Sequence, residues 1–517
     1  MKKSFTLQIW TGVLGAIAML AGNARAQLPG PNVPAQTPVA NQLPLSGRAG
    51  QNGTVSATQA PVPGATSSVN TLNTSVQAQG PYSGSVSGAA RSFSGKLSLN
   101  EAIQRGLEYN LGQASLRQAV RQASGQSKVS RAALLPNLNG SLTETVEQTN
   151  LRAFGIRLNS PVPGVSIPSV VGPFNYFDLR ARLTQTVVNL TQWNNYRSSR
   201  EMVESNEQSI RDARDLVVYA VGGAYVQVTA AKARIASQNA QLETANALFE
   251  QAQQQRGAGV LALTDLDRSH VQMLTERQRL VTIENDLSKQ KINLARLVGL
   301  PPNDQFDITD DVPFAQAPPL EMGAALNEAF SRRADLKAAE AQIRAAQHTR
   351  DAARAERLPS LSVNADYGAI GTNPAQAHGT FSVVGTLSFP IWQGGRTEGD
   401  IEEADAGVAQ RRAELEDLRG RIEADVRNAY LDLQAAGTQV EVARQNIDVA
   451  REALALTRQR LEAGVSTNVE VVPAQQSVAN AELDYIDSVF AHNVAKLTLA
   501  RALGAAADEL PRFLKTQ

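Results

Sequence analysis

The chain of 517 residues contains no cysteine and only four histidines, at positions 270, 348, 378 and 492. Without cysteine it can form no disulfide, thiolate nucleophile, iron–sulfur cluster or lipid-modified N-terminal cysteine. The histidines lie too far apart in sequence to show the short spacings of metal ligands. We therefore expect no metal site, no cofactor and no lipid anchor.

The chain also has no net charge and few aromatic side chains. Lys and Arg number 49, Asp and Glu number 49, the formal net charge is 0, and aromatic residues make up 5% of the chain. No basic field is available to hold nucleic acid, so no nucleic-acid partner is expected. The phrase at 394–396, Gly-Gly-Arg, lacks the Lys-Ser/Thr of a phosphate loop, and no nucleophile or acid–base cluster is visible. The sequence predicts a protein that is not an enzyme.

The N-terminus has the pattern of an export signal. Lys2 and Lys3 precede an apolar stretch over 9–21, and small residues follow in the run Ala24-Arg25-Ala26. Thirteen apolar residues are too few to cross about 30 Å of hydrocarbon as a helix. We expect residues 1–26 to be a cleaved signal peptide, so that the mature protein leaves the cytoplasm.

Residues 27–95 are dominated by Pro, Gly, Ser, Gln, Asn and Thr, with Arg48 and Arg91 as the only charged side chains. A segment of this composition has little apolar surface to bury against its ordering entropy. The composition predicts a disordered segment from 27 to 95.

The rest of the chain is an internal duplication. The string GGAYVQVTAAKARI at 222–235 aligns with RNAYLDLQAAGTQV at 427–440, an offset of 205 that also places GAGV on EAGV. A period of this kind indicates two copies of one structural unit. The predicted domains are a first repeat at 96–312, a second repeat at 313–506 and a C-terminal tail at 507–517.

Each repeat contains a long stretch of helical character. No proline occurs between Pro173 and Pro301 or between Pro390 and Pro473, and small and apolar residues recur at spacings of three and four. If 193–256 is one helix, it is about 95 Å long at about 1.5 Å per residue. The pattern predicts antiparallel coiled-coil helices.

Two short segments before each long helix alternate with period two. Apolar residues occupy every second position, at Leu138, Gly140 and Leu142, at Phe177, Leu179, Ala181 and Leu183, at Leu361, Val363, Ala365 and Tyr367, and at Phe381, Val383, Gly385, Leu387 and Phe389. Such hairpins could cover a soluble core, but their length, the export signal and the charged polar face favour a membrane barrel. Four strands cannot close a barrel and an open edge cannot face lipid, so the chain must oligomerise, and three chains would supply twelve strands.

Four motifs carry a resemblance to a known family. The steps LLPNL at 134–138 and RLPSL at 357–361, the phrase SFPIWQGGRTEGDIEEA at 388–404 and the turn LEAGVSTNVEVVPAQQ at 461–476 resemble the outer membrane efflux protein family, the TolC-like outer membrane factors, over about 97–505. The resemblance implies a mainly α fold, with long helices forming a periplasmic tunnel and four strands per chain in a trimeric twelve-stranded β-barrel. Without cysteine, the chain departs from the lipoprotein branch of that family.

The resemblance also implies a function. A homotrimer in the outer membrane of a Gram-negative cell, in contact with its lipid, would be the channel-tunnel of a tripartite efflux system. Its partners would be a periplasmic adaptor, or membrane fusion, protein and an inner-membrane pump of RND or ABC type. The alternatives are the duct of a type I protein secretion system and, from another class, a secreted structural coiled-coil protein.

Two helix–helix turns are the candidate functional sites. Glycine supplies the left-handed conformation that a helix C-terminus commonly needs, and the resemblance implies that the turns dock the adaptor. The predicted docking residues are Gly259, Val260, Leu261, Gly464, Val465 and Ser466.

An acidic residue follows each turn: Asp265 after the first and Glu470, 205 residues later, after the second. An acid in the first turn of a helix is favoured by the helix dipole, which is sufficient to explain both. The resemblance implies instead that Glu470, and by analogy Asp265, are aperture acids, with Pro473 in place of a second acid.

Overall fold

The computed structural model describes residues 55–61, 72–86, 95–155, 168–303, 305–310, 312–316, 320–463, 465 and 468–514. All of these belong to one compact unit, residues 50–517. The predicted signal peptide lies outside the described residues.

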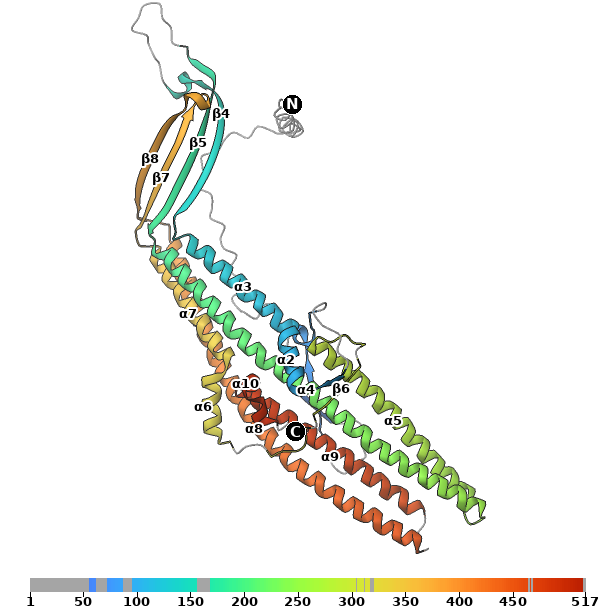
Figure 1. Cartoon of the computed structure of the whole chain (residues 1–517). Coiled ribbons are helices and arrows are strands. Elements are labelled where there is room, and N and C mark those ends of the chain that lie inside the picture. The colour runs from blue at the N-terminus through green and yellow to red at the C-terminus, as the bar shows by residue number, and fades with distance from the viewer. Residues whose placement is uncertain are drawn as a thin grey trace, which may run out of the picture. The chain divides into compact units, whose positions relative to one another are not determined.

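The element order is the same in both repeats (Figure 1). In each, two helices precede a pair of strands, a very long helix and a returning helix. In the first repeat these are α2 (Leu99–Tyr109), α3 (Leu111–Ala132), β4 (Asn137–Asn150), β5 (Val170–Val188), α4 (Leu190–Gly257) and α5 (Leu263–Val298). In the second they are α6 (Met322–Arg332), α7 (Ala334–Ala355), β7 (Ser360–Gly371), β8 (His378–Ser388), α8 (Arg396–Glu462) and α9 (Asn468–Ala502).

The two long helices have 68 and 67 residues, which corresponds to about 100 Å each. The expectation of one continuous helix over 193–256 is confirmed by α4. Within α4 lies an 18-residue window with a mean hydropathy of 1.2, and 72% of that window is buried. That burial is typical of a core helix, and the interior side chains are largely small, with many alanines that allow close packing.

The helices pack in two successive layers along α4 and α8. In one, α3 lies on α4, α4 on α7 and α7 on α8; in the other, α5 lies on α4, α4 on α9 and α9 on α8. Because α4 and α8 run through both layers, each spans the full length of the helical part (Figure 1). The main core lies where the layers meet, around Val217, Tyr225 and Leu497.

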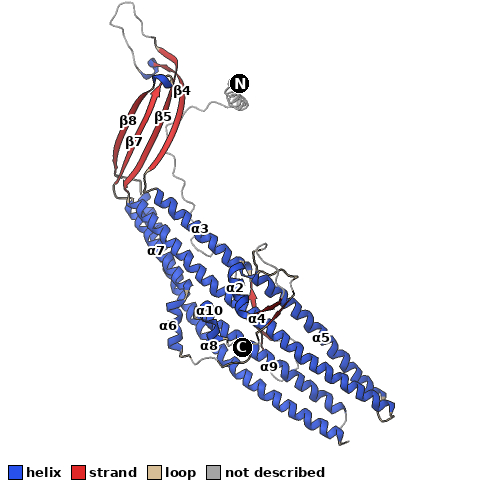
Figure 2. Ribbon diagram, viewed as in Figure 1, coloured by secondary structure: helices blue, strands red, loops and turns tan. Residues whose placement is uncertain are grey.

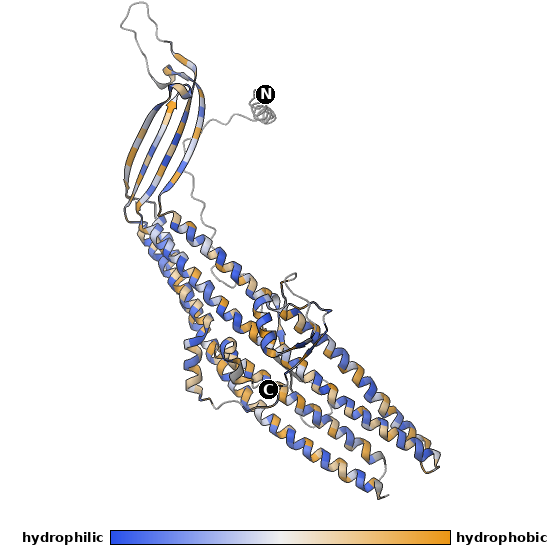
Figure 3. Ribbon diagram, in the orientation of Figure 1, coloured by the Kyte–Doolittle hydropathy of each residue, from blue (hydrophilic) through white to orange (hydrophobic). Residues whose placement is uncertain are grey.

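Four strands form one antiparallel sheet in the order β4-β5-β7-β8 (Figure 2). Its register pairs Leu142 with Leu179 and Tyr367 with Phe381, so the apolar positions of all four strands share one face. On this face Leu142 is 71% exposed and Phe381 78% exposed in the single chain. The predicted alternation is therefore confirmed. Hydrophobic and hydrophilic residues follow one another along each strand (Figure 3).

On the polar face, Arg180 of β5 connects three strands. Its guanidinium donates to Asp178 on its own strand, to Asp366 on β7 and, at 3.1 Å, to Thr380 on β8. Gly368 pairs with Arg180 and so lies between these strands without a side chain. The missing side chain leaves Arg180 room to reach across β7.

The prediction of disorder for 27–95 is wrong for residues 55–61 and 72–86. They form β1 (Val55–Pro61), β2 (Leu72–Ala78) and the short helix η1 (Gly80–Ser83). Val76 lies against Gly223 of α4, and Tyr82, 2% exposed, lies against Gly112 while its carbonyl accepts a hydrogen bond from Asn110 Nδ2. Composition alone could not reveal these long-range contacts. The other residues of 27–95 before β3 lie outside the description.

The connector between the repeats is held by both halves. Strand β6 (Phe306–Ile308) pairs in parallel with β3 (Gly95–Leu97), and Asn493 Nδ2 of α9 donates to the carbonyl of Val312. In the predicted tail, α10 (Ala506–Phe513) packs on the core, where Ala507 N–H donates to Asp215. The connector and α10 thus fasten the two repeats to each other.

Candidate functional site: the helical turns and the acids beside them

The first turn ends α4 with a left-handed glycine. Gly259 has φ +75°, its N–H donates to Arg256 O at 3.0 Å, and Val260 N–H donates to Gln255 O at 3.0 Å. These two bonds form a Schellman motif, which satisfies carbonyls that a helix end leaves unpaired. Arg256 Nη1 then closes the turn on the carbonyl of Leu261. The sequence expectation of a glycine-terminated helix turn is confirmed here.

The described bonds of the second turn match those of the first at an offset of 205 residues. Val465 N–H donates to Arg460 O at 3.0 Å, the equivalent of the bond from Val260 to Gln255, and Ala463 N–H donates to Gln459 O. Gly464 and Ser466 lie outside the described residues. Val260 is 77% exposed and Val465 68% exposed. Each turn therefore has one exposed valine among its described residues.

The acids after the turns make different ion pairs. Asp265 pairs with Arg268 one turn further along α5, at 3.1 Å. Glu470 instead pairs across the turn with Arg460 of α8, at 3.4 Å. The position equivalent to Arg268 in the second repeat is Pro473, which has no charge to offer. Each acid is thus balanced by a nearby arginine, and only the second one links two helices.

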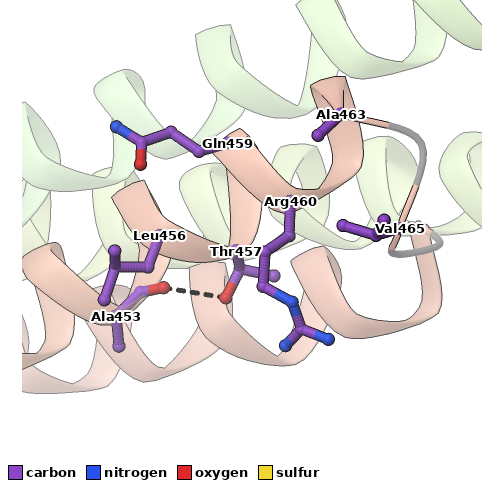
Figure 4. A pocket seen from close by; sticks show the side chains of 7 residues that line it. All are labelled: Ala453, Leu456, Thr457, Gln459, Arg460, Ala463 and Val465. Carbon is purple, nitrogen blue, oxygen red and sulfur yellow. Dashed lines mark hydrogen bonds between the residues drawn. The ribbon is translucent and has the colours of Figure 1, made fainter.

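A shallow hollow of about 530 Å³ lies on α8 beside the second turn (Figure 4). Leu456 and Val465 supply apolar surface, and the Arg460 side chain runs along it. The remaining lining residues are Ala453, Thr457, Gln459 and Ala463. The hollow is open and mostly apolar, so it fits a side chain of another protein surface better than a polar small molecule.

Behind the turns, polar bonds join α9 of the second repeat to the first. Arg234 of α4 pairs with Asp487 at 2.5 Å, and Ser237 donates to Glu482 at 2.8 Å. Within the first repeat, Glu276 is only 3% exposed and accepts hydrogen bonds from Gln238 and Gln272. The sequence did not reveal these bonds. Some of them join residues that are tens to hundreds of positions apart, and the others join polar residues that the sequence pattern places on the solvent-facing side of a helix.

A second set of charges lies in the middle of the molecule. Arg501 donates to Asp212 at 2.5 Å, and Arg333 pairs with Asp335 at 2.7 Å and Asp425 at 3.0 Å. Burial raises the pKa of Asp335, but the hydrogen bond and charge of Arg333 outweigh burial and bring the pKa below its ordinary value. The pKa of Asp215 is raised, mainly by burial.

Helix α9 also carries a buried histidine. Burial, assisted by the charge of Lys496, lowers the pKa of His492 to about 4. The ring lies 4.8 Å, centroid to centroid, from that of Phe314 in the connector. Neutral His492 therefore packs as part of the core rather than as an acid–base group. Among the described residues, no group of three or more His, Asp or Glu side chains could hold a metal ion.

Comparison with known proteins gives one consistent result. The family model described as outer membrane efflux protein matches residues 102–300 and 325–505. The outer membrane protein OprJ of Pseudomonas aeruginosa is 28% identical over 435 residues, covering 81% of this chain and 86% of OprJ. The outer membrane protein TolC of Escherichia coli is 22% identical over 339 residues, covering 62% of this chain and 68% of TolC. The crystal structure of the Campylobacter jejuni CmeC outer membrane channel superposes with a TM-score of 0.68 at 14% identity, covering 88% of this chain and 95% of CmeC.

Proposed function

Because this chain belongs to the outer membrane efflux protein family, we propose that three copies form the exit duct of a tripartite efflux system. The chain is an efflux channel of the outer membrane of a Gram-negative bacterium and not an enzyme. Family membership also removes the alternative of a secreted structural coiled coil. The proposal adds the number of copies, the partners and the residues that contact them.

The observation that most directly supports the proposal is the four-stranded sheet β4-β5-β7-β8. One face is apolar and exposed in the single chain, the other bears Arg180 and Asp366, and β4 and β8 are left at its two edges. Lipid cannot hydrogen-bond to a strand edge, so each β4 must pair with β8 of another copy. Three copies give twelve strands, with the apolar face toward lipid and the polar face toward a water-filled lumen.

Conduction through such a duct needs no chemical step. Solutes would pass along the polar inner face, driven by an inner-membrane pump of RND or ABC type to which a periplasmic adaptor connects the duct. The exposure of Val260 and Val465 supports adaptor docking at the turns. The other residues proposed for this contact are Gly259, Leu261, Gly464 and Ser466. The acids Glu470 and Asp265 would lie near the closed end, where three copies would concentrate negative potential.

The assembly is tested by isolating the mature chain from membranes in mild detergent. We expect a particle of three chains that keeps its β-sheet signal on heating to temperatures at which the separated chain loses it. The variant Thr143→Pro with Val383→Pro, within edge strands β4 and β8, should abolish the trimer, because proline has no N–H to donate to a strand ladder. Recovery of the wild-type chain as a water-soluble periplasmic monomer would contradict the proposal.

A further inference from the structure

The hairpin of β1 and β2 is held at one place on the helical wall. Strand β2 contacts both α4 and α9, and Val76 lies against Gly223 of α4. A Cβ at Gly223 would lie only 2.6 Å from a methyl carbon of Val76, so no side chain fits between them. Glycine inside a helix is destabilising relative to alanine. Gly223 thus has a packing reason, which is the close approach of the hairpin.

The wall that receives the hairpin is curved. Ser237 of α4 donates to Glu482 of α9, and the next residue, Gln238, donates to Glu276 of α5. Successive residues of a helix point about 100° apart, so α9 and α5 lie about 100° apart around α4 rather than on opposite sides of it. A hollow of about 120 Å³ is accordingly lined by side chains of all four helices α4, α5, α8 and α9. The four helices form a trough, with this hollow on its concave face.

The hairpin lies on the concave face of the trough. Counting along α4 at about 100° per residue places Gly223 about 40° from Ser237, in the direction of Gln238. Gly223 therefore points between α9 and α5. Because Val76 of β2 lies directly against Gly223, the hairpin occupies the inside of the trough.

The other short elements near this level lie on the back of the trough. On the same count, three residues of α4 point about 200–240° from Ser237, away from the concave face. Their contacts are Val221 with Gly106 of α2, Tyr225 with the Leu97 carbonyl of β3, and Lys232 with Asp307 of β6. The hairpin and the elements α2, β3 and β6 are therefore separated by the helical wall.

We propose that the hairpin β1–β2 lies inside the duct, where three copies narrow its middle and touch the solutes that pass. This inference rests on the proposed trimeric duct and adds a solute-contacting element to it. The walls of a closed ring curve around its axis, so the concave face of each wall faces inward. Helix α2 and strands β3 and β6, on the convex face, lie outside the duct.

The inward surface of the hairpin is polar and uncharged. Val55, Val76 and Ala78 pack on the core, whereas Ser56 and Gln77, which pair with each other in register, are exposed on the opposite face. Neither strand contains a charged residue. Uncharged polar groups can hydrogen-bond to a solute without favouring either sign of charge. The hairpins therefore select by size and hydrogen bonding rather than by charge.

The test uses an engineered cysteine, which the chain permits because it has none of its own. Gln77→Cys places a thiol on the exposed face of the hairpin, and Gln104→Cys places the matched control on an exposed position of α2. Cationic and anionic methanethiosulfonate reagents are added to single trimers in planar bilayers. Both reagents should lower the current of Gln77→Cys channels, and they should shift the ion preference in opposite directions, because the added charge lies in the conduction path. Labelled Gln104→Cys channels should keep the current and ion preference of the parent.

A second measurement uses intact Gram-negative cells. A polar maleimide too large for general porins can enter the duct from outside but cannot reach the periplasm. It should label Gln77→Cys in intact cells, and it should label Gln104→Cys several-fold less until the outer membrane is permeabilised. Both variants should react equally after permeabilisation.

The possible outcomes separate the hairpin from the duct. An unchanged current in labelled Gln77→Cys channels would overturn the inference and leave the trimeric duct standing. Labelling of Gln77→Cys that requires permeabilised cells would also overturn it, because the hairpin would then lie in the periplasm. Absence of conducting trimers in the parent chain would instead refute the proposed function.

Discussion

The middle of the molecule and its helical turns use charge in opposite ways. In the middle, the Arg333 and Arg501 side chains are 7% and 15% exposed and each is held by carboxylates. At the turns, the Arg268 and Arg460 side chains are 67% and 58% exposed. Exposed ion pairs contribute little to stability, whereas removing one partner of a buried pair is costly. The charges in the middle therefore fix the arrangement of the repeats, and those at the turns remain available for interaction.

The largest expected effect comes from the middle. Arg501→Met leaves the half-buried Asp212 and the buried Asp215 without their cation, so the free energy of unfolding should fall by about 3 kcal/mol or more. The matched control is Arg268→Met at the first turn, which removes an exposed pair and should cost less than about 0.5 kcal/mol. Denaturant unfolding of the purified protein measures both. Equal losses would remove the distinction between the two regions.

A smaller effect is expected from pH. The pKa of His492 is about 4 in the folded protein, below the usual value of about 6.5 for the unfolded chain, so the unfolded chain binds an extra proton between these values. Unfolding free energy should therefore fall as the pH drops from about 6.5 toward 4, by about 1–2 kcal/mol after allowing for solvent screening. His492→Gln should flatten that part of the stability profile, and His378→Gln on β8 should not. An unchanged slope in His492→Gln would assign the acid sensitivity to other groups.

At the turns, substitution should change function without changing stability. Val260→Asp with Val465→Asp adds exposed charge, so unfolding should shift by less than about 0.5 kcal/mol. Export should nevertheless fall at least tenfold, because an unpaired charge would be buried when the adaptor docks. The control, Val260→Thr with Val465→Thr, keeps the shape without charge and should retain most export. Normal export by the aspartate variant at normal membrane levels would show that docking occurs elsewhere.

The smallest effect on folding is expected at Glu470. Glu470→Gln replaces half of an exposed ion pair with Arg460, and stability should stay within about 0.5 kcal/mol. Planar-bilayer recordings should show weaker cation preference and weaker block by trivalent cations, because a ring of three carboxylates would be lost. Asp265→Asn makes the same test of the first-repeat acid, which pairs with Arg268 on its own helix. Identical selectivity in Glu470→Gln and the parent would show that the acid only supports the helix terminus.

Local sequence patterns were sufficient to predict most of the fold. Alternation along Leu138 and Leu142 was sufficient to assign the face of a strand, because a strand has a strict period of two. The absence of proline, together with small and apolar residues at spacings of three and four, predicted α4, and the glycine at 259 predicted a turn. In each case the signal lies within a few residues of the element that it determines.

Contacts between distant segments could not be predicted. Tyr82 lies in a segment whose composition indicates disorder. Its burial depends on Gly112 in α3 and on Asn110, the residue just before α3. The pairing of Glu470 with Arg460 depends on the fold of the turn, whereas the sequence showed only an acid near a helix start. The cross-repeat pair of Arg234 and Asp487 is separated by 253 positions. Such contacts follow from packing, which single-sequence patterns do not encode.

The unequal lengths of the strands would shape the rim of the proposed trimeric barrel. Strand β5 pairs with β7 only from Phe177 onward, so residues 170–176 rise beyond β7 with β4 as their described partner. Seven residues correspond to roughly 23 Å at about 3.3 Å per residue. In a threefold barrel the outer rim would therefore not be level: three tall hairpins would alternate with three low ones. With the hairpin ends facing outward in the proposed barrel, antibodies, phages and other particles arriving from outside would meet the tall hairpins first. Sequence changes there would alter what recognises the cell without altering the conduit beneath.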